Sequence, residues 1–251
     1  MNKATRFTNL TAIIGIIVIS ISGCKKQDSF TTHPVNGVTI AIFNSSKTYG
    51  SMTDQDGNIY RTITIGTQTW MAENLRTTIF RNGDTIPKVI DNTAWQNINS
   101  SAYCNGNNLN NDDSITSYGR LYNWFAVNDN RKLAPKGWHV PSNDEWTTLL
   151  NYLGGKDDAG GKLKEAGTTH WLYPNACATN ESGFTALPGI NRSFDGTFSI
   201  LYARYWPYWW SSNSDYQDTA PSVGLDFEVC LVQNGGYANN HFGYFVRCVK
   251  D

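Results

Sequence analysis

The sequence predicts an α+β protein from three observations: one helix with a readable start and stop, an alternating hairpin near the beginning of the folded part, and short strand patterns towards the end. The helix begins at Ser142, because Glu145 three residues later completes a capping box. It ends at Gly154 and Gly155, which tolerate the left-handed backbone of a C-terminal cap. One face is apolar and is therefore predicted to be buried, since its residues recur at i, i+3, i+4 and i+7: Trp146, Leu149, Leu150 and Leu153.

The first residues predict export and a lipid anchor. Lys3 and Arg6 precede an apolar run at 10–21, which has the length of a signal-peptide core and is too short to span a bilayer. Cys24 closes the segment Ile-Ser-Gly-Cys, which resembles the bacterial lipobox, where the cysteine is diacylated and becomes the mature N-terminus. We therefore expect residues 1–23 to be removed, and Cys24 to anchor an outer-membrane lipoprotein in the cell envelope.

Composition argues against nucleic acid as a partner. The whole chain has a formal charge of −1, and loss of Lys3 and Arg6 with the signal peptide leaves −3. This balance is mildly acidic, and the sequence lacks the basic cluster that binds a phosphate backbone. With 16% charged and 13% aromatic residues, the chain has a composition that is common in exported β-rich proteins. No phosphate loop or Ser/His/Asp signature is present, so we predict no cofactor and no catalytic residues.

Residues 24–52 are mostly polar and are predicted to be a flexible tether to a domain at 53–251. An apolar island at 38–43 interrupts the tether and is also compatible with a strand of a small N-terminal extension. The domain opens with a predicted turn at 54–58. A calcium-binding loop that starts at Asp54 is the alternative interpretation of these residues. Such a loop needs a glutamate at its twelfth position, where this chain has Ile65, so the plain turn is favoured.

The remaining elements are predicted in chain order. Alternation over 59–65 and a returning arm at 69–72 predict a hairpin. Helices are expected at 118–127 and 159–166. Because the last strand pattern stops just before the end of the chain, we expect it to pair with the first hairpin and close a single domain. The last third contains three predicted strands: 208–211, 224–232 and 244–249.

Four cysteines remain after the lipidated one, and an even number in an exported chain favours two disulfides. Three connectivities are open. Our first choice places each strand cysteine against a loop or helix cysteine, because that geometry is the easiest to satisfy. The chosen pairs are Cys104 with Cys248 and Cys177 with Cys230. No spacing among cysteines and histidines predicts zinc, and His139, His170 and His241 have no metal-ligand spacing either.

Taken in order, these segments resemble the Fibrobacter succinogenes major paralogous domain, an exported family found largely in Bacteroidetes and Fibrobacteres. The resemblance covers nearly all of the chain after Thr53. That family has no settled activity, so the resemblance implies an architecture and little chemistry. It is carried by DQDGNIYRTITIGTQTWMAENLRTT at 54–78, YGRLYNWFAV at 118–127, LAPKGWHVPSNDEWTTLLNYLGG at 133–155, GGKLKEAGTTHW at 160–171, NESGFTALPGINR at 180–192, YWWSSN at 208–213 and GYFVRCVKD at 243–251.

More distantly, GWHVPSNDEW and GYFVRCV resemble segments of the formylglycine-generating enzymes and of the C-type lectin fold. This resemblance implies paired terminal strands, two main helices and a long irregular β-rich loop region that carries function. The chain departs from both activities. Cys230 and Cys248 do not match the enzyme's active-site pair, and the calcium motifs of true lectins are replaced by Tyr-Pro-Asn at 173–175 and Trp-Ser-Ser at 210–212.

The densest aromatic cluster is the candidate ligand site, because aromatic faces stack on sugar rings and anchor protein partners. Burial of at least one face of this strand in the core is the competing interpretation. We therefore favour a non-catalytic binding or adhesion role, with a glycan or a surface protein as ligand. An enzyme of formylglycine-generating-like fold and a structural cell-surface component are the alternatives. The cluster consists of Trp206, Tyr208, Trp209 and Trp210.

Overall fold

The computed structural model describes residues 40–198, 205–213 and 218–251. The chain divides into a unit of residues 1–33 and a unit of residues 34–251, and every described residue belongs to the second. This second unit combines short helices with antiparallel sheets, which confirms the α+β class. Its two hydrophobic clusters consist of residues between 43 and 249. A chain that lacks the first 24 residues therefore keeps every core contact described below.

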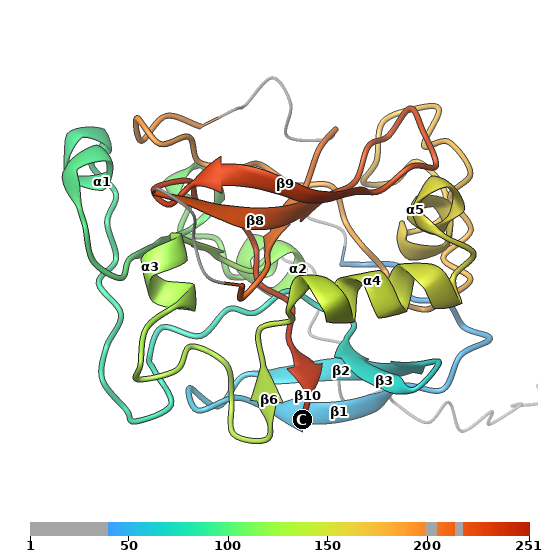
Figure 1. The fold of residues 1–251 in the computed structure, drawn as a ribbon, viewed down its shortest axis with the longest axis horizontal. Coiled ribbons are helices and arrows are strands. Elements are labelled where there is room, and N and C mark those ends of the chain that lie inside the picture. The colour runs from blue at the N-terminus through green and yellow to red at the C-terminus, as the bar shows by residue number, and fades with distance from the viewer. Residues whose placement is uncertain (1–39, 199–204, 214–217) are drawn as a thin grey trace, which may run out of the picture. The chain divides into compact units, whose positions relative to one another are not determined.

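A five-stranded sheet has the order β1-β2-β3-β10-β6, and all neighbours are antiparallel (Figure 1). The predicted hairpin is confirmed, since Ile63 pairs with Trp70. The predicted closure by the last strand is also confirmed, because Val249 pairs with Trp70 on one side and with His139 on the other. The strands are β1 (Gly50–Thr53), β2 (Ile59–Ile65), β3 (Gln68–Met71), β6 (Trp138–His139) and β10 (Val249–Lys250).

The folded part begins earlier than predicted. Strand β1 pairs along its whole length with β2, and Phe43 and Tyr49 pack against the core. Residues 40–43 are irregular rather than a strand, and the Ile42 N–H donates to a carboxylate oxygen of the buried Glu165 at 2.5 Å. Residues 40–52 therefore belong to the domain, and the rest of the predicted tether, 24–39, lies outside the described residues.

The turn predicted at 54–58 is confirmed. One carboxylate oxygen of Asp54 accepts from the backbone N–H groups of Asp56 and Asn58, both at 2.9 Å. The other accepts from the Asn58 side chain at 2.9 Å and from the Tyr60 hydroxyl at 2.6 Å. The Asp54 carboxylate is thus bound by protein donors, as in an Asx turn.

The helix predicted between Ser142 and Gly154 is confirmed as α4 (Asn143–Tyr152), with Ser142 as its N-cap. The Ser142 hydroxyl accepts from the Glu145 N–H at 3.3 Å, and the Glu145 carboxylate accepts from the Ser142 N–H at 2.8 Å, which completes the capping box. Gly154 and Gly155 follow the helix with φ of 102° and 96°. Local sequence signals alone therefore define both ends of this helix.

Helix α4 lies between the five-stranded sheet and strands β8 and β9 (Figure 1). Its Trp146 is buried, with the ring centroid 4.8 Å from that of Trp70 on β3 and 6.5 Å from that of Trp209 on β7. The apolar face of the helix therefore joins the two sheets. Strand β7 (Tyr208–Trp210), β8 (Thr219–Gly224) and β9 (Gln233–Asn239) form the second, three-stranded sheet.

The prediction of one helix over 118–127 is wrong. Gly119 has a φ of 81°, which ends α2 (Asp112–Tyr118), and a Cβ there would collide with Asn74. The Asn123 side chain then accepts from the Ala126 N–H at 3.1 Å and starts α3 (Trp124–Val127). Between the two helices, β5 (Leu121–Tyr122) pairs with β4 (Tyr103–Cys104).

Two other predicted elements differ in their bounds or their type. The third helix is present as α5 (Lys156–Leu163), three residues earlier than expected. The strand over 224–232 is wrong, because β8 ends at Gly224 and the Asp226 carboxylate accepts from the Glu228 N–H at 2.8 Å, which favours a local turn over strand pairing. Helix α1 (Asn92–Asn97) was not predicted.

The strand predicted at 244–249 is present only at its end. Tyr244 and Phe245 form isolated bridges to Tyr122 and Trp209, and Val249 alone of this range lies in an assigned strand. The segment therefore crosses from the smaller sheets to the five-stranded sheet instead of following one of them.

Buried arginines hold the irregular segments together. Arg192 donates to the backbone oxygens of Val89 at 2.5 Å and Ile90 at 2.9 Å, about a hundred residues away along the chain. Arg247 donates to the Asn74 side-chain oxygen at 2.8 Å, between the rings of Phe184 and Trp209. Burial lowers the pKa of Arg247 to about 9. Each guanidinium thus donates hydrogen bonds to oxygen atoms of these segments that would otherwise need water as a donor.

Candidate functional site

The aromatic cluster predicted as a ligand site is mainly core. Trp209 and Trp210 on β7 are 1% and 0% exposed, and they point into different hydrophobic clusters. Their indole N–H groups donate to the Asn74 side chain and to the Tyr122 carbonyl, both at 2.8 Å. Binding of a ligand by these two residues was a wrong prediction, because the strand is covered on both faces.

The other two members of that cluster are half-buried. Tyr208 stacks on Tyr244 with ring centroids 5.2 Å apart, and its hydroxyl lies 3.2 Å from the Gln233 side-chain oxygen. Trp206 packs beside Tyr205, with ring centroids 5.8 Å apart. A ligand role for Trp206 and Tyr208 stays a prediction.

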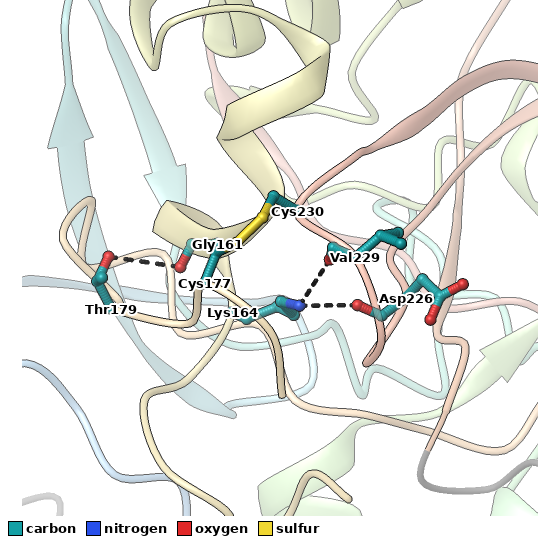
Figure 2. The surroundings of a disulfide bond; sticks show 7 residues. All are labelled: Gly161, Lys164, Cys177, Thr179, Asp226, Val229 and Cys230. Carbon is teal, nitrogen blue, oxygen red and sulfur yellow. Dashed lines mark hydrogen bonds between the residues drawn. A yellow bond between two sulfur atoms is a disulfide. The ribbon is translucent and has the colours of Figure 1, made fainter. Parts of the chain in front are cut away.

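One predicted disulfide is present, and it joins Cys177 to Cys230 (Figure 2). The other predicted pair was wrong, since Cys104 and Cys248 are free and buried. Cys104 packs in the cluster that contains Trp146, whereas Cys248 packs in the cluster that contains Trp210, so the two thiols are separate parts of the core. Burial raises the pKa of the Cys104 thiol to about 12 and raises that of Cys248 further still.

The disulfide lies against helix α5, where two glycines allow close approach. The Gly160 N–H donates to the Cys230 carbonyl at 2.9 Å, and a Cβ on Gly160 or Gly161 would collide with the backbone of Cys230 or Cys177. Beside it, Lys164 donates to the carbonyl oxygens of Asp226 at 2.7 Å and Val229 at 2.9 Å (Figure 2). Burial lowers the pKa of Lys164 to about 8. These bonds fix the loop after β8 to the helix, which is a structural role.

The three histidines considered as metal ligands have separate partners. His139 lies between carboxylate oxygens of Glu145 at 2.6 Å and Asp251 at 2.7 Å. The buried His170 lies 2.7 Å from a Glu165 oxygen, whereas His241 contacts Asn239 and Asn99. Among the described residues, no group of three His, Cys, Asp or Glu side chains is arranged to hold a metal ion.

The candidate functional site is a cavity of about 280 Å³ beside helix α2. It is formed by the loop before α2, by one side of α2, and by two residues far apart in sequence, at 190 and 245. The lining also includes the polar side chains of Asn105, Asn107 and Ser114 and three glycines. Its apolar wall consists of Leu109, Ile115, Tyr118, Ile190 and Phe245.

The shape of the cavity loop is fixed by asparagines. The Asn105 amide donates to the Leu109 carbonyl at 2.8 Å, while its oxygen accepts from the Arg120 guanidinium. Asn107 and Asn108 have φ of 50° and 54°, a left-handed backbone that asparagine tolerates better than most residues. Asn111 caps α2, because its side chain accepts from the Ser114 N–H at 2.8 Å.

Sequence reasoning missed this site, although a signal was present. No helix or strand was predicted over the segment from Asn105 to Asp113, which lacks periodicity. The pattern Asn111-Asp112-Asp113 is a helix start, with a capping side chain followed by acidic residues in the first turn. Recognising it would have placed a short helix against an Asn-rich loop. The contributions of Ile190 and Phe245 depend on tertiary packing and have no local signal.

The predicted lipidation site, Cys24, lies outside the described residues. Within the described ranges, no helix has both the length and the hydropathy that a membrane span needs. This finding does not bear on a lipid anchor at Cys24, so the lipoprotein assignment stays a prediction.

Comparison with known proteins gives a family match. The model of the Fibrobacter succinogenes major domain matches residues 63–250. No curated protein and no solved structure matches the chain significantly. The match spans the five-stranded sheet from β2 onwards, helix α4 and the whole cavity, in agreement with the family resemblance of the sequence segments. The chain therefore belongs to the Fibrobacter succinogenes major domain family.

Proposed function

We propose that the protein is an exported lipoprotein of the outer membrane whose domain binds a ligand without transforming it, the ligand being a glycan or another protein. The observation that carries the proposal is the composition of the cavity wall. Among the described residues, its lining contains no carboxylate, imidazole, amine or thiol, and Tyr118 is the one titratable side chain there. General acid–base or nucleophilic catalysis needs such groups in convergent positions. A concave, largely apolar site without them is suited to binding.

The fold we propose for this binding domain is C-type-lectin-like. Three features support this: the first hairpin pairs with the last strand, helix α4 packs on the sheet, and long irregular segments lie between them. The cavity is built from those irregular segments, where this architecture would place a binding site.

The proposal is tested with the chain from residue 25 onwards, which keeps the whole described core. The protein is applied to a glycan array and used as bait in a pull-down from envelope extracts, with a Leu109→Ser variant in parallel. Saturable binding that the variant weakens is the expected result. No ligand in either assay together with turnover of a substrate would favour an enzyme of formylglycine-generating-like fold. Absence of both binding and turnover would favour a structural surface component.

A further inference from the structure

We infer that the cavity takes an uncharged apolar group, an aromatic ring or a branched aliphatic chain, and that a sugar does not fill it. This inference rests on the proposed binding function and narrows its ligand. The group can belong to a free small molecule or to the side chain of a partner protein, since the chemistry that recognises it is the same.

Size sets the first limit. A cavity of about 280 Å³ is larger than the engineered cavities of about 150 Å³ that hold benzene. It lies just below the range of about 300–1,000 Å³ that is typical of whole drug-sized ligands. The space therefore fits one ring system or one branched side chain rather than an extended ligand.

The wall sets the second limit. Leu109, Ile115 and Ile190 present aliphatic carbon, and Tyr118 and Phe245 present rings. Gly189 has no side chain, and this allows the Phe245 ring to form part of the wall. A Cβ on residue 189 would collide with that ring. Apolar contacts of this kind favour a ligand group that sheds its hydration shell without losing hydrogen bonds.

The polar side chains around the cavity set the third limit, because they are few and the Asn105 amide among them already binds protein atoms. Both ends of the Asn105 amide are engaged, by the Leu109 carbonyl and by Arg120. The Arg120 Nε also donates to the Arg76 carbonyl at 2.8 Å. The other polar side chains of the described lining are those of Asn107, Ser114 and Tyr118. A sugar ring carries more hydroxyl groups than these three side chains can satisfy, and each buried hydroxyl without a partner opposes binding.

Charge sets the last limit. No charged side chain in the described part of the chain lines the cavity, so a carboxylate, phosphate or ammonium group would lose its hydration there without gaining an ion pair. The favoured ligand group is therefore both uncharged and apolar.

The inference is tested by NMR titration of the chain from residue 25 onwards with four probes: indole, N-acetyltryptophanamide, methyl glucoside and N-acetylglucosamine. Saturable shifts of the Leu109, Ser114 and Ile190 amides with the ring compounds alone are expected. Equal or tighter binding of N-acetyltryptophanamide relative to indole identifies a protein side chain as the source. Binding of indole alone identifies a free small molecule.

Two variants remove the site in opposite ways. Leu109→Ser shortens an exposed wall residue and is expected to weaken ring binding by about tenfold or more. Ser114→Trp fills the cavity while keeping the backbone N–H that Asn111 caps, and is expected to abolish ring binding. Ile59→Ser is the matched control, because Ile59 is 51% exposed, Leu109 is 53% exposed, and Ile59 lies outside the cavity wall.

The outcomes separate this inference from the proposed function. If a sugar shifts the cavity amides and the ring compounds do not, the inference is overturned while the proposed function stands. If no probe shifts these amides, the inference is also overturned, and the proposed function falls with it only when the glycan array and the pull-down are empty too. If Ile59→Ser weakens ring binding as much as Leu109→Ser does, the binding is not at the cavity and the inference is wrong.

Discussion

Replacing Trp146 by alanine is expected to destabilise the domain by about 3–5 kcal/mol. The side chain is 1% exposed, and a buried tryptophan removes about 150–250 Å² from water. At about 25 cal/mol per Å² this burial contributes about 4–6 kcal/mol, an upper estimate because the unfolded chain already buries part of that area. The Trp146 indole N–H has no hydrogen-bond partner among the described residues. The loss is therefore one of packing against Trp70 and Phe184.

Ser142→Ala is the matched variant at the start of the same helix. It removes the hydroxyl that accepts from the Glu145 N–H at 3.3 Å and is expected to cost about 1 kcal/mol. The Glu145 carboxylate still accepts from the backbone N–H of residue 142, so half of the capping box survives. Packing is therefore expected to outweigh capping severalfold.

Urea unfolding of both variants measures the difference, provided that the m-values agree with that of the wild type. The expected order of midpoints is wild type, then Ser142→Ala, then Trp146→Ala. An equal or smaller loss for Trp146→Ala than for Ser142→Ala would refute the reasoning. Helix α4 would then contribute little to joining the two sheets, and the architecture described for the core would be wrong.

Three further predictions concern pH, the disulfide and the anchor. Burial lowers the pKa of His139, but hydrogen bonds to Asp251 and Glu145 outweigh it and raise the pKa overall. The unfolding free energy is therefore expected to fall as pH rises above about 6.5, the value of a free imidazole, and urea midpoints of His139→Asn should lack this slope. Removing the Cys177–Cys230 bridge, which spans 53 residues, with a double serine variant is expected to cost about 4 kcal/mol in the chain-entropy model; a midpoint like that of the wild type in urea would contradict it. Cys24→Ala is expected to move the protein out of the membrane fraction, and retention of the variant there in high salt would refute the lipid anchor.

The parts of the fold that could be predicted are those with complete local signals. Helix α4 has a cap, an apolar face and a glycine stop within the residues from Ser142 to Gly155, and β2 alternates over Ile59–Ile65 with an interruption at Arg61. The helix over 118–127 failed for the opposite reason. Its periodicity was helical, but Gly119 and Asn123 each impose a backbone that ends or restarts a helix. The helix break at Gly119 and the N-cap at Asn123 therefore override the helical spacing of the apolar residues.

The candidate site was harder to predict because its determinants are distant in sequence. The aromatic run at 206–210 drew attention through its composition, yet Trp209 and Trp210 on β7 are buried and Tyr208 is half-buried, so composition alone could not separate core from ligand site. The cavity instead combines an Asn-rich loop with Ile190 and Phe245, which tertiary packing brings to it. The bonds from Arg192 to Val89 and Ile90 are of the same kind, since no local pattern indicates which carbonyls a buried guanidinium will bind.

The stability of the domain and the affinity of the cavity are expected to respond differently to pH, because different groups surround His139 and the cavity. His170 lies behind one wall residue, with its ring centroid 6.0 Å from that of Tyr118, but no carboxylate, imidazole or amine of a described residue lines the cavity itself. Arg120 beside it binds the uncharged oxygens of Asn105 and Arg76. The surroundings of His139 differ, because its imidazole lies between the carboxylates of Glu145 and Asp251. Hydrogen bonds to these two groups raise the pKa of His139, so its charge depends on pH. Raising the pH from 6 to 8 is therefore expected to lower the urea midpoint while leaving the affinity of the cavity for indole unchanged. A fall in affinity parallel to the fall in midpoint would contradict this expectation and would show that the cavity is coupled to the His139 end of the sheet.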